Sequence, residues 1–185
     1  MTYEESTEET TFSPEMESGL FQVVLDRASA AIDALGSAAN LDQAFACLPS
    51  AAAAAFHLER FADAKEFAER SISLAARYQS DWNYGNALHI GHTVLGLLAL
   101  RDNDIKNAIH HLHASSETPG SPQLGSFGPT MQLAKELLRS GQVAPVMEYL
   151  TQCRVFWKMG KVWLSLWERV IHEGRVPNFF QHSYV

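Results

Sequence analysis

The sequence predicts an all-α fold made of antiparallel helical hairpins that pack side by side. Apolar residues recur at the spacing of a helix, and typical start and stop residues bound the segments. One helix–turn–helix pattern also repeats along the chain, whereas no segment shows a pattern typical of strands. The 185 residues are enough to bury one good core, so we expect a single helical domain.

The internal repeat appears when the segment around Ala108 is laid over the segment around Val146, at an offset of 38 residues. Gly96 then falls on Ala134, and two tight turns, at residues 101–104 and 139–142, fall at the same place. A fainter copy lies 44 residues upstream, around Ala64. Because small side chains let helices approach closely, we expect Gly96 to face Ala108 and Ala134 to face Val146.

This pattern resembles the tetratricopeptide repeat family, whose repeats place a large residue and then Gly or Ala in the first helix and Ala in the second. The resemblance covers residues 45–158 and implies a right-handed superhelix of antiparallel hairpins, with a groove formed by the first helices. The sequence departs from the family in its spacings of 44 and 38 residues, against 34, and in lacking the first-helix tryptophan. Longer helices or inserted loops must absorb the difference.

Residues at the two ends of the chain give the domain boundaries. Residues 1–12 are rich in Glu and Thr and predict a flexible acidic tail, and Ser13-Pro14 predicts a helix start with Gly36 at its end. The helical domain is expected over residues 13–178, with Pro49 interrupting a helix. A final helix over residues 161–172 is expected to cap the stack, and residues 179–185 are expected to form a C-terminal tail.

Composition excludes several classes of function. The formal charge of −7 comes largely from six glutamates ahead of Arg27, so the rest of the chain is nearly neutral and no nucleic acid is expected as a partner. No apolar run is long enough for a membrane span, and the N-terminal residues lack the features of a secretory signal, so we expect a cytoplasmic protein. Cys47 and Cys153 are interpreted as small buried hydrophobic residues.

The predicted helix over residues 82–101 carries the first group of candidate binding residues, Asn83, Asn86, His89 and His92. It is apolar on opposite sides, which predicts a place in the centre of the stack. One interpretation is a polar patch that hydrogen-bonds a peptide or small molecule, and the alternative is a pair of histidines satisfied by nearby protein groups. Two histidines without a third ligand predict no metal site. If this helix brought His89 or His92 to His111, a metal cluster would become possible.

Residues 115–129 contain three prolines and three glycines and are expected to form a long loop, in which Leu124 and Phe127 are buried as anchors. Gln123 and Ser126 would then contact a ligand, or the loop would serve as a structural plug. With the flanking stretches DWNYGNALHIGH and CRVFWKMG, the loop resembles a family of small bacterial tetratricopeptide-like proteins of undefined activity, over residues 50–178. Arg154 lies in the second stretch and would bind an acidic group of a partner, or pack its stem on Trp157.

The sequence therefore favours a protein- or peptide-binding module that acts through the groove of a helical stack and uses no cofactor. No nucleophile elbow, zinc-protease motif or phosphate loop predicts catalytic residues. One alternative is a small-molecule-binding protein or metal-dependent enzyme that uses His89 and His92 under the loop 115–129. Another is a structural protein that self-associates, as a homo-oligomer, through aromatic residues near the C-terminus, including Phe156, Trp157, Trp163, Trp167, Phe179 and Phe180.

Overall fold

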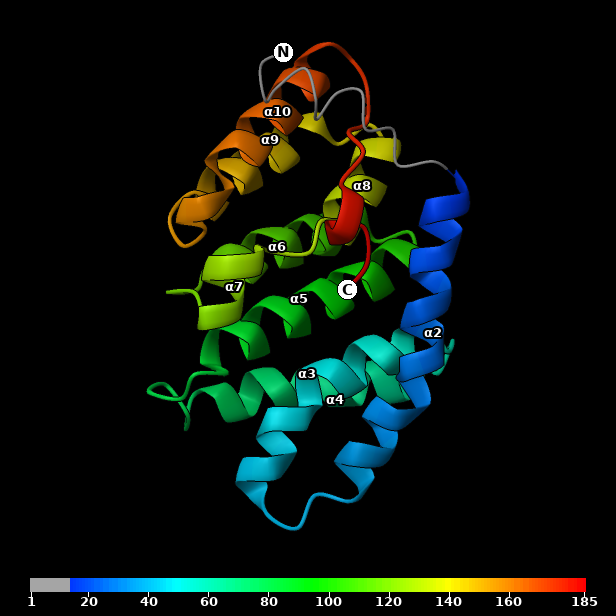
Figure 1. Cartoon of the computed structure of the whole chain (residues 1–185), viewed down its shortest axis with the longest axis vertical. Coiled ribbons are helices and arrows are strands. Elements are labelled where there is room, and N and C mark those ends of the chain that lie inside the picture. Colours follow the sequence, from blue (N-terminus) through cyan, green and yellow to red (C-terminus); the bar gives the residue numbers. More distant parts are fainter. Residues whose placement is uncertain (1–13) are drawn as a thin grey trace.

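The computed structural model of the chain describes residues 14–185, and over this range it contains helices and no β-strand, as predicted (Figure 1). The predicted acidic tail and the expected cap at Ser13 lie outside the described residues. The helices are α2 (Pro14–Gly36), α3 (Leu41–His57), α4 (Phe61–Ala75), α5 (Tyr84–Arg101), α6 (Ile105–Ser116), α7 (Pro122–Phe127), α8 (Gln132–Arg139), α9 (Val143–Cys153) and α10 (Lys161–His172). Short 3-10 turns occur at Lys158–Gly160 and Phe180–His182. No helix in the described part of the chain has the length and apolar character of a membrane span.

Neighbouring helices along the chain also pack against each other in space. Helices α2 to α6 form a series in which each contacts the next, α8 and α9 pack on α6, and α10 packs on α9 (Figure 1). Helix α5 contacts α3, α4, α6, α7 and α8 and is buried on several sides, because residues such as Ala87, Val94 and Leu97 face different neighbours. The predicted central place of this helix is therefore confirmed.

The turns that follow α3, α5 and α8 have the same backbone geometry. Each turn has three residues, and the middle one has a positive φ: 58° at Glu59, 60° at Asn103 and 83° at Gly141. In each, the last turn residue donates its N–H to the carbonyl five residues earlier, at 2.8 to 2.9 Å. The middle residues are separated by the 44 and 38 residues of the sequence repeat, so the repeat corresponds to recurring helix–turn–helix units with the two predicted turns in place.

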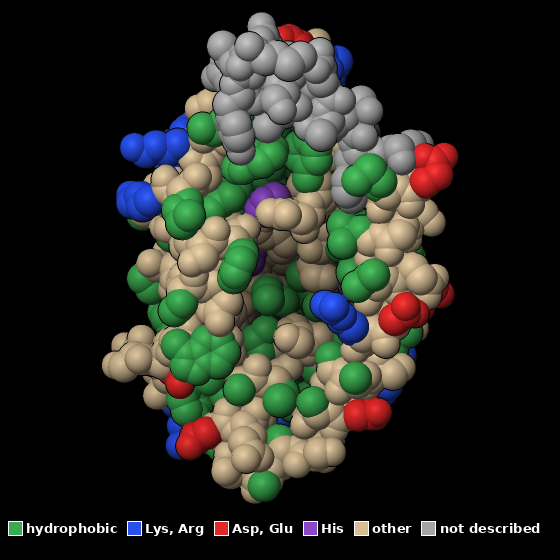
Figure 2. All heavy atoms as spheres, in the orientation of Figure 1, with side chains coloured by type: hydrophobic (Ala, Val, Ile, Leu, Met, Phe, Trp, Pro, Cys, Tyr) green, Lys and Arg blue, Asp and Glu red, His purple; other side chains and the backbone are tan. Residues whose placement is uncertain are grey.

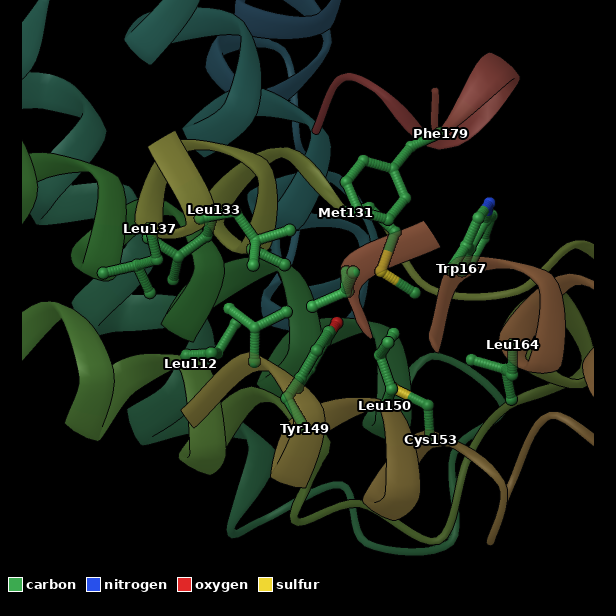
Figure 3. Close-up of a cluster of buried hydrophobic side chains, with 14 of the residues drawn as sticks. Leu112, Met131, Leu133, Leu137, Tyr149, Leu150, Cys153, Leu164, Trp167 and Phe179 are labelled. Carbon is green, nitrogen blue, oxygen red and sulfur yellow. The ribbon is translucent and has the colours of Figure 1, made fainter. Parts of the chain in front are cut away.

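Small side chains lie where these helices cross. A methyl group on Gly96 would overlap the side chain of Leu133 on α8 and lie 3.1 Å from Cβ of His111 on α6, so α5 meets both helices at this glycine. Ala108, Ala134 and Val146 are buried in one hydrophobic cluster that joins α6, α8 and α9. Figure 3 shows Leu112, Leu133, Leu137, Tyr149 and Leu150 converging in the same core, with Trp167 and Phe179 at its far side.

The structure corrects two expectations about local breaks. Pro49 does not interrupt a helix, since α3 continues through it from Leu41 to His57, with the side chain of Asn40 accepting the N–H of Gln43 as a cap. Residues 115–129 are not one long loop, because α6 extends to Ser116 and α7 begins at Pro122 behind a Ser121 cap. Most residues of the predicted loop are thus helical.

The C-terminal residues also differ from expectation. Helix α10 has the predicted bounds and ends before Gly174, whose φ is +76°, but residues 179–185 then return to the helical body. Phe179 is fully buried, with its ring 5.0 Å from that of Trp167. Phe156, Trp157 and Trp167 are buried as well, so most of the aromatic residues expected to form an exposed surface for self-association belong to the core.

Candidate functional site

A cavity of about 500 Å³ opens between α3, α5, α7 and residues 181–185. Figure 2 shows this face of the molecule hollowed near its centre, with hydrophobic side chains around the hollow. Polar and aromatic side chains from distant segments line it, including Ser50, Trp82, Asn83, Asn86, His89, Gln123, Phe127, Thr130, Gln181, His182 and Tyr184. The lining contains no Asp, Glu, Lys or Arg side chain. Burial lowers the pKa of His182, and that of His89 to about 4, so both rings are neutral at pH 7.

Asn86 lies at the centre of a side-chain network on one wall of the cavity. Its Nδ2 donates to Oδ1 of Asn83 at 3.1 Å and to Oε1 of Gln123 at 3.2 Å. Its Oδ1 accepts the hydroxyl of Ser121 at 2.6 Å, and Asn83 in turn donates to the carbonyl of Phe45 at 3.1 Å. The network joins α3, α5 and α7, and both N–H donors of Asn86 are used within the protein.

His89 is fully engaged by the protein. Its Nε2 accepts the backbone N–H of Thr130 at 3.1 Å, which leaves the proton on Nδ1, where it is donated to the carbonyl of Ser115 at 2.9 Å. Neither ring nitrogen is therefore free for a metal ion or for proton transfer, and His89 contributes only its ring surface to the cavity. This arrangement matches the interpretation of His89 as a histidine satisfied by nearby protein groups.

His92 does not share the cavity with His89. It faces α6, where its Nδ1 lies 3.1 Å from Nδ1 of His111. Burial and the neighbouring His111 lower the pKa of His92 to about 4, and burial also lowers the pKa of His111. His110 is exposed, whereas His113 approaches the carbonyl of Pro145 at 3.1 Å. In the part of the chain that the structure describes, no three His, Cys, Asp or Glu side chains come together as metal ligands.

Two exposed aromatic side chains stand at the cavity. Trp82, just before α5, is 53% exposed, and Phe127, at the end of α7, is 71% exposed. The expectation that Phe127 is a buried anchor was therefore wrong, whereas Leu124 is buried as expected. A six-residue helix presents only one side to the core, and Leu124 lies on that side. Phe127 lies on another side of α7, where its ring borders the cavity.

Ser126 and Arg154 lie away from the cavity. Ser126 is exposed on α7 and is not part of the lining. Arg154, at the end of α9, pairs with Glu168 of α10 at 2.5 Å and donates to the hydroxyl of Ser165 at 3.2 Å. Its guanidinium thus has an acidic partner within the fold, so the expected role in binding a partner's acidic group has no geometric support.

Backbone groups of residues 181–185 are held by side chains of α3 and α8 and by the backbone of the residue before α8, a feature that the sequence analysis missed. The N–H of Val185 donates to Oε1 of Gln132 at 2.8 Å, and Nε2 of His57 lies 2.9 Å from the carbonyl of Val185. The carbonyl of His182 accepts the N–H of Met131 at 2.7 Å. These partners are up to 128 residues apart in sequence, and no local signal marks them.

The ring of Tyr184 lies 5.1 Å from that of Phe21 on α2, between this helix and His57 of α3.

Comparison of the chain with protein-family models, with curated proteins and with solved structures found no significant match.

Proposed function

We propose that the protein is a peptide- or protein-binding module, in which α3/α4, α5/α6 and α8/α9 act as tetratricopeptide-like hairpins of a right-handed superhelix. The cavity between α3, α5 and α7 is the open part of its groove, and an extended segment of a partner enters there. A cytoplasmic location is part of the same proposal.

The observation that carries this proposal is the seating of residues 181–185 at one end of the cavity. Side chains on α3 and α8 hydrogen-bond the backbone of this segment, as Gln132 and His57 do for Val185. Backbone hydrogen bonding is one of the modes by which proteins hold peptide segments, and pockets beside the backbone then select side chains. Toward Trp82 and Phe127 the groove continues with two exposed aromatic rings and with Gln123 as a polar side chain.

The lining also restricts the ligand. Because no charged side chain lines the cavity, a charge carried into it would lose hydration and find no partner. The exposed rings of Trp82 and Phe127 supply apolar contact, and the side-chain amide of Gln123, largely exposed, supplies polar contact. The ligand segment is therefore uncharged and carries at least one aromatic or aliphatic side chain.

A screen of a random peptide library displayed on phage against the full chain tests this function. We expect enrichment of uncharged peptides with aromatic residues, and loss of their binding to the double variant Trp82→Ala, Phe127→Ala. The matched control is Val155→Ala, an exposed apolar position outside the cavity, which should leave binding unchanged. Enrichment of no peptide, or equal binding to the double variant, would refute the proposal.

Catalysis by His89 is not part of this proposal, because Thr130 and Ser115 occupy both of its ring nitrogens. His92 lies outside the cavity, so the two histidines do not form one patch.

A further inference from the structure

We infer that residues 181–185 are a detachable internal ligand of the groove, and that a partner segment with the same pattern replaces them. The inference rests on the proposed function and names the class of partner. That partner presents an uncharged segment that begins in a 3-10 turn, as Phe180–His182 does, and then places an aromatic residue before an aliphatic one, as Tyr184 precedes Val185.

Part of the contacts of this segment can be made by other sequences, and part are specific to His182, whose Nδ1 lies 2.9 Å from the carbonyl of Pro129 and whose ring lies 5.0 Å from that of Trp157. The three backbone hydrogen bonds, from Met131 to His182 and at both backbone groups of Val185, depend on no particular side chain. The Tyr184 ring packs against Phe21 at 5.1 Å and reaches His57 at 6.1 Å, which is the range of favourable aromatic contact. An aromatic residue at the place of Tyr184 and a histidine at the place of His182 are therefore the side-chain requirements for binding at this position.

Two features oppose seating of the segment and make it exchangeable. The hydroxyl of Ser183 is buried without a hydrogen-bond partner among the described residues, which is unfavourable relative to a hydrated hydroxyl. Phe180, the residue just before the segment, has a φ of +50°, a left-handed conformation that a non-glycine residue adopts only at an energetic cost. Release of residues 181–185 relieves both, whereas Phe179 stays fixed in the core beside Trp167.

Release would also enlarge the groove. Gln181, His182, Tyr184 and Val185 all line the cavity, so their departure joins the cavity to the surfaces of His57 and Gln132. A partner segment then continues from the open part of the groove, at Trp82 and Phe127, into the vacated seat.

The test uses a chain that ends after Phe180 and the synthetic peptide acetyl-Gln-His-Ser-Tyr-Val-amide, with binding measured by fluorescence anisotropy or calorimetry. We expect the shortened chain to bind the peptide and the full chain to bind it at least about tenfold more weakly. The attached segment competes at a local concentration in the millimolar range for a short linker. A peptide with Ala in place of its Tyr, and the shortened chain carrying Gln132→Ala, should both lose binding. The shortened chain carrying Gln79→Ala, a change at an exposed glutamine outside the groove, should keep it.

A second measurement, on the full chain, keeps the inference testable if the shortened chain does not fold. In amide hydrogen exchange, the N–H of Met131, whose acceptor is on His182, should exchange at least about tenfold faster than the N–H of Lys135 in α8. Equal exchange rates of the two amides would overturn the inference. A shortened chain that folds but does not bind the peptide would overturn it as well. If library peptides still bind the full chain in that case, the proposed function stands and only the detachable ligand fails.

Discussion

The backbone N–H of Thr130 donates to Nε2 of His89 at 3.1 Å, and this bond fixes the ring as the tautomer with its proton on Nδ1. The same ring reaches Ser115 at 2.9 Å, so one histidine of α5 holds both the end of α6 and the start of the segment leading into α8. Because the ring is 1% exposed and held in its neutral form, its protonation is coupled to folding.

The stability of the protein should therefore fall in mild acid. The unfolded chain takes up a proton at His89 near the ordinary histidine pKa of 6.5, whereas burial lowers the folded-state pKa to about 4. The contribution of neutral His89 is present above pH 6.5 and is lost progressively as the pH falls toward 4, by up to about 3 kcal/mol. Urea denaturation at pH 7.5, 6 and 5 measures this loss. His89→Gln should be less stable at pH 7.5 and show a shallower dependence on pH, and an unchanged slope would contradict the assignment.

Gly85 should not tolerate a side chain, because of its contact with the segment before α7. A methyl group there would overlap the backbone carbonyl of Gly120 and lie 3.0 Å from Oγ1 of Thr118. Backbone atoms cannot rotate away as the end of a long side chain can, so Gly85→Ala should lower the free energy of unfolding by about 1–3 kcal/mol. It should also loosen the Ser121 to Asn86 hydrogen bond and the nearby cavity wall.

Gly19→Ala is the matched control for this change. A methyl group at Gly19 on α2 would meet nothing within 4 Å, and alanine is favoured over glycine inside a helix by about 0.8–1 kcal/mol. We expect a small gain in stability from Gly19→Ala in the same thermal or urea denaturation. A loss of equal size in the two variants would show that the loss does not come from the Gly120 contact.

Two changes at Asn86 should differ in severity. Asn86→Ala removes a buried amide, whereas Asn86→Asp keeps its shape but replaces the donor Nδ2 with an oxygen, which then faces both Oδ1 of Asn83 and Oε1 of Gln123. The aspartate also buries a charge beside a cavity with no charged partner, so it should cost about 1–3 kcal/mol more than the alanine at pH 7.5. Chemical denaturation of both variants measures the difference. Equal stability of Asn86→Asp and the wild type would contradict the network.

The two cysteines should react differently with a thiol reagent such as DTNB. Cys153 is 0% exposed, and burial raises the pKa of its thiol, so the reactive thiolate is not available in the folded protein. Cys47 is partly exposed on α3. We expect one rapid equivalent of reaction in native buffer and two in denaturant, with the rapid one lost in Cys47→Ala. Rapid modification of Cys153 in the folded chain would show that the core around Tyr149 opens readily.

Local signals in the sequence located helix ends better than they located breaks. The final helix begins and ends where its apolar spacing and Gly174 predict, because capping and backbone conformation act within one turn of helix. Pro49 was misjudged because its missing N–H is one loss among the many favourable contacts of a buried helix. Phe127 was misjudged because an aromatic residue in a turn-rich segment gives no information about which side the segment presents.

The sequence by itself determined that the chain is helical, where the first and last described helices lie, and that tight turns recur at residues 101–104 and 139–142. Only the tertiary structure decided which side chains share the cavity, since their hydrogen bonds join residues 37 apart for Asn86 and Gln123 and 128 apart for His57 and Val185. Helices and tight turns depend on hydrogen bonds between residues a few positions apart. The grouping of side chains around the cavity depends on how the buried faces of several helices fit together, which spacing along the chain does not encode.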